Sequence, residues 1–268
     1  MTQEQRLDYL IEQFKEDSGE YALLQVGRSG EEKRRALRSL MNIRMPRELD
    51  EETLRVQDEY LTARAEERGV VTPEAIPPVS VTLQSRRPFA DRIAIWQGDI
   101  TRLACDAIVN AANSQMLGCF APLHACIDNC IHTFAGLRLR NKCAELTQKQ
   151  GHEEPTGQAK LTPAYNLPCK YVIHTVGPIV QGALTDEHRS LLKSCYRSCL
   201  ELANRHGLES IVFCCISTGV FMFPNDEAAH IAVDTVKEYL DGTNTIKRVV
   251  FNVFKDIDKE IYSDLLAD

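Results

Sequence analysis

The segment RIAIWQGDITRLACDAIVNAANS, residues 92–114, contains two short apolar runs, and each is followed at once by a polar loop. The runs have the length and composition of buried strands, and the loops begin with residues typical of turns. We expect strands over residues 79–85, 92–98, 107–113, 171–177, 211–217 and 248–254. Helical patterns lie between them over residues 127–148, 187–207 and 226–242. Strands that alternate with helices of this length predict an α/β sandwich.

The first 75 residues have a different texture from the rest of the chain. Apolar residues recur there at the spacing of one helix face: Leu7, Leu10, Ile11 and Phe14. Ser29, with Glu32 three residues later, has the pattern of a capping box that begins a second helix. A third periodic segment covers residues 50–69 and ends at a glycine, and a proline-rich linker follows. We therefore expect residues 1–75 to form a small helical extension and residues 79–268 to form the main domain.

Composition excludes several classes of protein. Of the 268 residues, 44% are hydrophobic and 26% are charged, which is ordinary for a globular chain. The longest apolar-leaning stretch, residues 211–223, is too short to span a bilayer. The N-terminal sequence MTQEQRLDYL lacks the basic and apolar regions of a secretory signal, so we expect a cytoplasmic location.

The net charge narrows the range of partners. Lys and Arg number 31 and Asp and Glu number 38, which gives a formal charge of −7. A protein that binds a nucleic-acid backbone needs a basic face, which this balance does not suggest. A phosphate group needs only a few backbone N–H groups at a helix N-terminus. The charge therefore argues against nucleic-acid polymers and leaves nucleotides open.

Ten cysteines lie in the stretch from Cys105 to Cys215, and the first hundred residues contain none. A cytosolic chain would keep them reduced, and most have the setting of small core residues. Cys119, Cys126 and Cys130 stand apart because they lie close together in the sequence.

This segment has the spacing Cys119-x4-His124-x-Cys126. Two sulfurs and an imidazole nitrogen suit Zn²⁺, and three protein ligands leave one position open, as in catalytic zinc sites. Cys130 as a fourth ligand would close the site and make the zinc structural. The same residues are also compatible with a loop that caps a helix and contains buried thiols.

Ligands of α/β sheets bind outside the carboxyl ends of the strands, so the loops after the strands form the candidate site. Asp99 in GDIT can accept a hydrogen bond from an amine such as that of adenine, or it can cap a turn. Asn110 and Asn113 in VNAANSQ can bind ribose hydroxyls, or they can satisfy the backbone of their own turn. The loop ISTGVFMFP, residues 216–224, offers N–H groups and hydroxyls to an anion, although a generic strand-to-helix loop has a similar composition.

GDIT, NAAN, PTGQAKLTPAYNLPCKYVIHTVGP (155–178) and STGVFMFPNDEAA (217–229) occur in the order and spacing of the macrodomain, a module that binds ADP-ribose. The chain resembles that family over residues 79–268. The resemblance implies a three-layer α/β/α sandwich around a mixed sheet, with Asp99 and Ile100 at the adenine amine. It also implies a diphosphate site formed by Ser217, Thr218, Gly219, Val220 and Phe221. Phe254 would lie against the adenine ring, unless it is a plain core aromatic.

The sequence departs from the common macrodomain pattern after NAAN. Many catalytically active macrodomains have a run of glycines there and then an Asp just before a helix. This chain has LGCFAPLHACIDNCIH, residues 117–132, in which Cys119, His124 and Cys126 replace most of the glycines and Asp128 keeps its place. The loop is similar to that of the zinc-containing macrodomains, which also have an N-terminal helical extension.

This resemblance implies a zinc-dependent hydrolase that removes mono-ADP-ribose from protein side chains such as Asp or Glu. Asn113 and Asp128 would be catalytic: Asn113 would position the ribose, and Asp128 would orient or deprotonate the attacking water. Zinc would either activate that water or clamp the substrate. Some members act beside a sirtuin-type transferase and a lipoyl-carrier protein. The alternatives are a non-catalytic ADP-ribose reader and a hydrolase of O-acetyl-ADP-ribose with a structural zinc.

Overall fold

The computed structural model describes residues 1–268 and contains one six-stranded sheet. Its strands are β1 (Ile93–Gln97), β2 (Ala107–Ala112), β3 (Ala159–Pro163), β4 (Tyr171–Val176), β5 (Ser210–Phe213) and β6 (Arg248–Val253). Their order in space is β1-β6-β5-β2-β4-β3, and all neighbours are parallel except β3 and β4. The mixed sheet that the sequence predicts is therefore confirmed.

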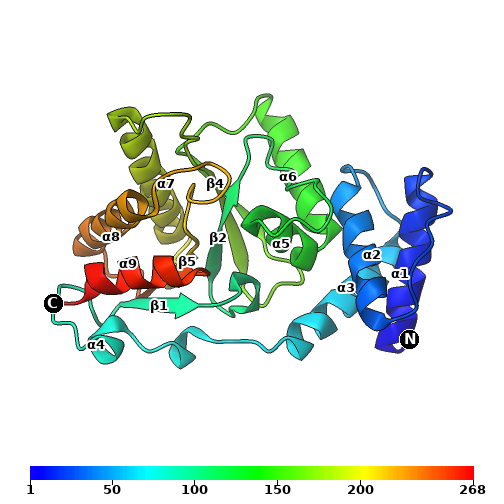
Figure 1. Ribbon diagram of the computed structural model, residues 1–268, viewed down its shortest axis with the longest axis horizontal. Helices are drawn as coiled ribbons and strands as arrows, with labels where there is room; N and C mark the ends of the chain where they lie inside the picture. Colours follow the sequence, from blue (N-terminus) through cyan, green and yellow to red (C-terminus); the bar gives the residue numbers. More distant parts are fainter.

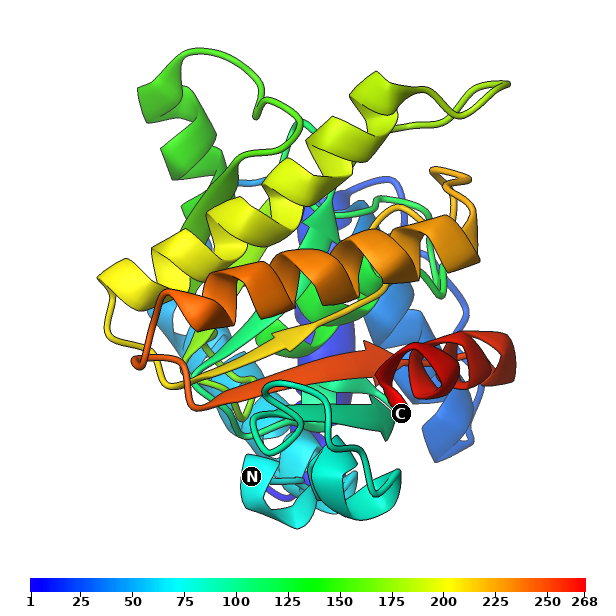
Figure 2. The same cartoon turned by 90° about the vertical axis from the view of Figure 1, so that its left-hand side faces the viewer.

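Helices cover both faces of this sheet and give the molecule three layers (Figure 1). One face carries α7 (Asp186–Arg205), α8 (Asn225–Asp241) and α9 (Asp256–Leu266). Figure 2 shows α7 and α8 side by side across that face. The opposite face carries α5 (Ile127–Ala135) and α6 (Leu137–Gln150). A continuous core of 48 buried residues fills the space between the layers, which confirms the three-layer prediction.

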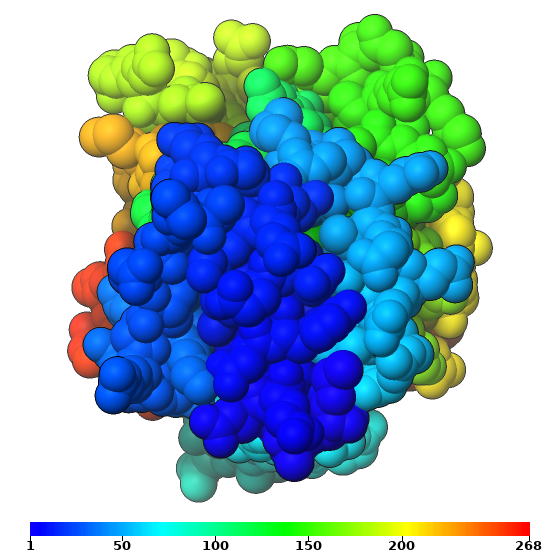
Figure 3. Space-filling view, turned by 90° about the vertical axis from the view of Figure 1, so that its right-hand side faces the viewer, coloured from blue at the N-terminus to red at the C-terminus, as the bar shows by residue number.

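The chain begins with three long helices: α1 (Gln3–Ser18), α2 (Gly30–Ile43) and α3 (Glu51–Glu67). Side-chain oxygens of Thr2, Ser29 and Asp50 cap their N-termini, and the predicted capping box of Ser29 and Glu32 is formed. Their apolar faces meet in a separate cluster of 11 buried residues, one of which belongs to α6. Figure 3 shows the three helices together, covering one side of the molecule.

Buried polar contacts join these helices to the main body. Arg140 of α6 is 3% exposed, and its Nη1 donates to the carbonyls of Met41, Asn42 and Arg44 at 2.9, 2.9 and 2.6 Å. These carbonyls end α2, where a helix leaves its last C=O groups without partners inside the helix. The arginine satisfies them and places positive charge at the negative end of the helix dipole. The extension therefore packs on the α5–α6 layer as part of one structure.

The strand predicted over residues 79–85 is wrong, because Val79–Thr82 forms the short helix α4. The alternating apolar residues fit a strand. Pro78 lies at the N-cap position, however, where its fixed φ is compatible with the start of a helix. Val79 and Leu83 lie one helical turn apart, and both pack against the core. A short run of alternating residues is therefore compatible with one turn of helix.

The single helix predicted over residues 127–148 is in fact α5 and α6, divided at Gly136. Gly136 has a φ of +89°, which other residues rarely adopt and which breaks the helical hydrogen bonding. The sequence prediction also did not include β3, α9, or the short 3₁₀ helices η1 (Pro73–Ala75) and η2 (Ile100–Arg102). No helix is both long enough and apolar enough to cross a membrane.

Candidate active site

The carboxyl ends of four neighbouring strands meet along one edge of the sheet. β1, β6, β5 and β2 are adjacent and parallel in that order. They are followed by Asp99, Phe254, residues 217–221 and Asn113, respectively. The structure therefore brings four predicted ligand-binding segments into one row, at the place where α/β sheets bind ligands.

Asp99 lies at the β1 end of this row, and both of its carboxylate oxygens have partners. Oδ1 accepts hydrogen bonds from the N–H and the hydroxyl of Thr101 at 3.0 and 2.6 Å, so Asp99 caps η2 as a turn residue would. Oδ2 accepts from Arg68, whose guanidinium lies 3.6 Å from the centroid of the Phe134 ring. Arg68 follows α3, and no local pattern in the sequence indicates this contact. The Ile100 side chain is buried, so only its backbone can face a ligand.

The loop after β5 presents backbone N–H groups rather than hydroxyls. Ser217 has a φ of +65° and a buried side chain, and the Thr218 hydroxyl donates to a backbone carbonyl at 3.0 Å. The hydroxyls therefore face inward, contrary to the expectation that they point at an anion. The N–H groups of Gly219, Val220 and Phe221 make no hydrogen bond within the chain. Several unpaired N–H groups in one tight loop suit an anion.

A glycine at the end of β4 allows this loop to lie where it does. A Cβ on Gly177 would lie 2.0 Å from Ser217 Oγ and 2.9 Å from a methyl carbon of Ile216. No side-chain carbon fits at such distances, so the side chains of Ser217 and Ile216, or the loop that carries them, would have to move.

Phe254 follows β6 and is 80% exposed, so the interpretation of this residue as a plain core aromatic is wrong. Its carbonyl accepts a hydrogen bond from Gln97 at 3.4 Å, at the end of the β1–β6 pair. The ring therefore stands at the ends of the same two strands as Asp99, where it is free to stack on a planar ligand.

Asp128, in the first turn of α5, is a buried carboxylate with two amide partners. It is 5% exposed. Asn110 Nδ2 donates to Oδ1 at 2.8 Å, and Asn113 Nδ2 donates to Oδ2 at 3.4 Å. Burial raises the pKa of Asp128 to about 6, although the hydrogen bond from Asn110 acts in the opposite direction. The structure thus brings together Asn113 and Asp128, the two residues predicted to be catalytic, and a buried carboxyl with a raised pKa is typical of functional sites.

Asn110 faces the core, which neither sequence interpretation of this residue predicts. Its Nδ2 also donates to His174 Nδ1 at 3.2 Å, so His174 Nε2 carries the proton and donates to the Thr162 hydroxyl at 3.0 Å. His174 is thus a core histidine with both ring nitrogens satisfied, and burial lowers its pKa to about 3. His132 lies 3.6 Å from Asp128, and burial lowers its pKa well below the usual range. Both imidazole rings are therefore neutral, and neither of them places a positive charge beside Asp128.

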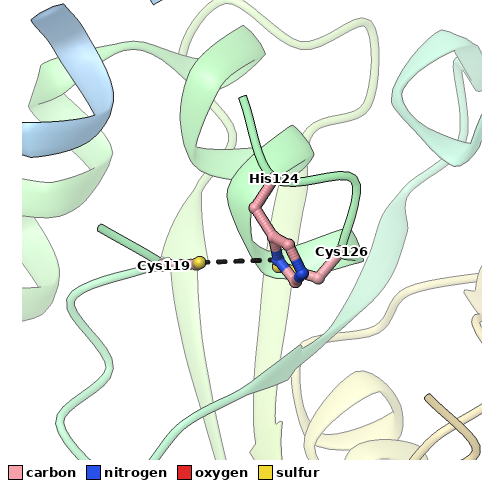
Figure 4. Close-up of side chains that lie close together, drawn as sticks. All are labelled: Cys119, His124 and Cys126. Carbon is pink, nitrogen blue, oxygen red and sulfur yellow. Dashed lines mark hydrogen bonds between the residues drawn. The ribbon is translucent and has the colours of Figure 1, made fainter. Parts of the chain in front are cut away.

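Residues 119–126, here called the Cys/His loop, bring the three predicted metal ligands together (Figure 4). One ligand atom each from Cys119, His124 and Cys126 lies within 4.8 Å of the other two, and Cys119 Sγ is 3.6 Å from His124 Nδ1. Zinc bonds of about 2.0–2.3 Å place tetrahedral ligand atoms roughly 3.5 Å apart. Two sulfurs and one imidazole nitrogen therefore fit Zn²⁺ in their chemistry, and the distance between Cys119 and His124 matches this spacing.

Cys126 also caps α5, because its Sγ accepts the Asn129 N–H at 3.4 Å, so the capping part of the alternative is confirmed, whereas the thiols of this cluster are only half-buried. Burial raises the pKa of Cys126 to about 12, whereas a bound cation favours the thiolate. Cys130 lies one turn further along, with its Sγ 3.6 Å from Arg38 Nη2. It is not among the grouped ligand atoms, so the geometry does not favour it as a fourth ligand.

Comparison with known proteins agrees with this geometry. Residues 109–232 match the family model described as "Macro domain". The chain is 51% identical over 267 residues to the "Protein-ADP-ribose hydrolase" of Treponema medium, with 100% of both chains covered. It is 45% identical over 262 residues to the protein of that name from Staphylococcus aureus, with 97% of this chain and 95% of that one covered. A crystal structure of the Trypanosoma brucei macrodomain in complex with ADP-ribose is similar with a TM-score of 0.67 and 30% identity, covering 83% of this chain and 93% of that one.

Proposed function

Because this chain belongs to the macrodomain family and its full-length relatives are named protein-ADP-ribose hydrolases, we propose that it removes ADP-ribose from modified proteins. The observation that carries the proposal is the buried carboxylate of Asp128, which lies beside Asn113 at one end of the row of loops. Burying a carboxylate is costly unless it is well compensated. A protein that only bound ADP-ribose would not need this group at the position of the distal ribose.

The order of the strand ends indicates how ADP-ribose would lie across the sheet. We place the adenine at Asp99 and Phe254, and the diphosphate on the unpaired N–H groups of residues 219–221. Because β2 is the next strand in the sheet, the distal ribose then lies at Asn113 and Asp128. The adenosine and diphosphate contacts supply binding energy away from the reacting bond and fix the position of that bond.

The bond to be broken joins the distal ribose to a protein side chain, which we propose to be Asp or Glu. Asn113 would hold the ribose. Asp128 would orient the attacking water and take its proton, so that cleavage yields free ADP-ribose and an unmodified carboxyl group. A positioned general base of this kind contributes typically about 10²–10⁴-fold to the rate.

We further propose that Cys119, His124 and Cys126 hold Zn²⁺ next to the distal ribose. The metal would supply a Lewis acid at the reacting end of the substrate. Three protein ligands with one open position are typical of a catalytic zinc rather than a structural one. Asn113 supports this location, because its Nδ2 donates to the carbonyl of Gly118 at 3.1 Å, directly before the first ligand.

The resemblance to the zinc-containing macrodomains favours one class of substrate in particular. A lipoyl-carrier protein modified by a sirtuin-type transferase belongs in the first panel of substrates, beside a protein modified generally at Asp and Glu. Release of ADP-ribose from the carrier alone would indicate that the enzyme recognises the carrier protein. Release from both substrates would indicate that it recognises the linkage rather than the protein.

The decisive experiment measures ADP-ribose release from these proteins by the enzyme as purified, after treatment with a chelator, and after zinc is restored. We expect activity to be lost on chelation and regained with zinc. Full activity in the metal-free protein would refute the zinc dependence. Binding of ADP-ribose without release under any condition would identify a reader, and cleavage of O-acetyl-ADP-ribose alone would identify a small-molecule hydrolase.

A further inference from the structure

Helix α2 of the N-terminal extension contacts two consecutive residues of the Cys/His loop, Leu123 and His124. Arg38 Nη2 donates to the carbonyl of His124 and to Oδ1 of Asn129, both at 2.7 Å. Asn42 is buried, and its Oδ1 accepts the N–H of Leu123 at 3.0 Å. The backbone on both sides of the Leu123–His124 peptide is therefore bonded to a helix that lies 81 to 86 residues earlier in the chain.

Leu123 is the strained position of this loop. Its φ of +60° lies in the left-handed region, which a leucine rarely adopts. Such a conformation persists only where its surroundings determine it. Asn42 provides that surrounding, because its Nδ2 is fixed in turn by the Thr133 hydroxyl at 3.0 Å. Asn42 thus stabilises the turn that directs His124 toward Cys119.

Asn129 extends the same support to the first predicted ligand. It is fully buried, and its Nδ2 donates to the carbonyls of Cys119 and Ala121 at 3.1 and 3.0 Å. Its Oδ1 accepts from Arg38, as described above. A continuous set of hydrogen bonds therefore runs from Arg38 through Asn129 to the backbone of Cys119.

We propose that Arg38 and Asn42 are positioning residues of the metal site, so that α2 sets how tightly the Cys/His loop binds zinc. The inference rests on the zinc site proposed above. A loop that is ordered before binding loses less conformational entropy when the metal enters. Groups that orient metal ligands without touching the metal typically change its affinity about 10–100-fold when they are removed. The arginine and asparagine would act on affinity and leave the ligand set unchanged.

The test measures zinc affinity of the full chain by competition with a chelator of known affinity, together with the absorption spectrum of the cobalt-loaded protein. We expect Arg38→Ala and Asn42→Ala to weaken zinc binding about 10–100-fold. The thiolate-to-cobalt absorption at saturation should match that of the wild type, because the same ligands remain. Arg35→Ala, at an exposed position of the same helix, is the matched control and should keep wild-type affinity.

Wild-type zinc affinity in a folded Arg38→Ala protein would overturn the inference. If this variant does not fold, Arg38→Lys replaces it: lysine keeps the charge and the stem but loses the planar fork that reaches both acceptors. A smaller loss of affinity is expected for Arg38→Lys, and wild-type affinity would again overturn the inference. A wild-type chain that binds neither zinc nor cobalt would instead refute the metal site itself, and this result would be seen before any substitution is made.

Discussion

Replacement of Asp128 by asparagine tests the proposed catalytic role with almost no change in side-chain volume. In the wild type, Oδ1 accepts from Asn110 at 2.8 Å and Oδ2 accepts from Asn113 at 3.4 Å. An asparagine keeps an oxygen for the shorter bond and directs its NH₂ group at the NH₂ group of Asn113. One long hydrogen bond is thus exchanged for a contact between two donors, and we expect the free energy of unfolding to fall by only about 1–2 kcal/mol.

Activity should fall much further than stability. The variant lacks the group that takes the proton from water, so kcat should drop about 10²–10⁴-fold, or roughly 3–5 kcal/mol in the activation free energy. The contacts of ADP-ribose with the other three loops are unchanged. Its affinity should therefore stay close to that of the wild type, which is the pattern of a residue that acts mainly in the transition state.

The assay combines initial rates of ADP-ribose release at saturating substrate with calorimetric binding of ADP-ribose and thermal unfolding. Asp186→Asn is the matched control, because Asp186 is fully exposed in the first turn of α7. An Asp128→Asn enzyme with wild-type kcat would refute the catalytic assignment. A loss of ADP-ribose affinity as large as the loss of rate would show that Asp128 serves binding instead.

Three further predictions concern the ligand loops and the extension. Arg68→Ala removes the guanidinium that contacts Asp99 and should weaken ADP-ribose binding by up to about tenfold, since this pair is partly exposed; unchanged affinity by calorimetry would contradict the role given to Arg68. Gly177→Ala forces a Cβ to within 2.0 Å of Ser217 Oγ and should lower both ADP-ribose affinity and the free energy of unfolding, the latter by about 1–3 kcal/mol; a thermal melt identical to that of the wild type would rule this out. Burial alone would raise the pKa of Asp17, but the hydrogen bonds from Arg47 and Arg44 outweigh the effect of burial and lower the pKa. The pKa of an aspartate in an unfolded chain is about 4. The Asp17 carboxylate therefore contributes its full stabilisation above about pH 4, and this contribution is lost as the pH falls further. Asp17→Asn should lower the urea midpoint at pH 7 and approach the wild type below about pH 4, and a difference that is constant with pH would contradict the ion-pair explanation.

The central strands could be predicted from the sequence because they are buried on both faces. β2, β4 and β6 are continuous apolar runs with turn residues after them, and neither helices nor loops share that pattern in this chain. β3 lies at an edge of the sheet, where Lys160 and Pro163 interrupt the pattern, and it was not predicted. The segment over residues 79–85 alternates like a strand, but β1 at that edge has only β6 as a neighbour. The alternation of apolar and polar residues within one segment does not show whether the sheet has a place for that segment as a further strand.

The candidate site divides in the same way. The Cys/His loop could be proposed from the spacing of its ligands, and Asp99 and Asn113 from the resemblance of their motifs to those of the macrodomain family. The contact of Arg68 with Asp99 and that of Arg38 with Asn129 could not, because the partners are 31 and 91 residues apart. Long-range pairs of this kind depend on how the helices pack and have no local sequence signal.

The contact between α2 and the Cys/His loop also orders events during synthesis. Arg38 is made 91 residues before Asn129, which corresponds to roughly 5–18 s at the usual rates of translation. The helices of the extension are therefore complete when the cysteines leave the ribosome, and they can serve as a template on which the loop folds as it emerges. A chain synthesised without its first helices would release the same cysteines with no surface to receive them.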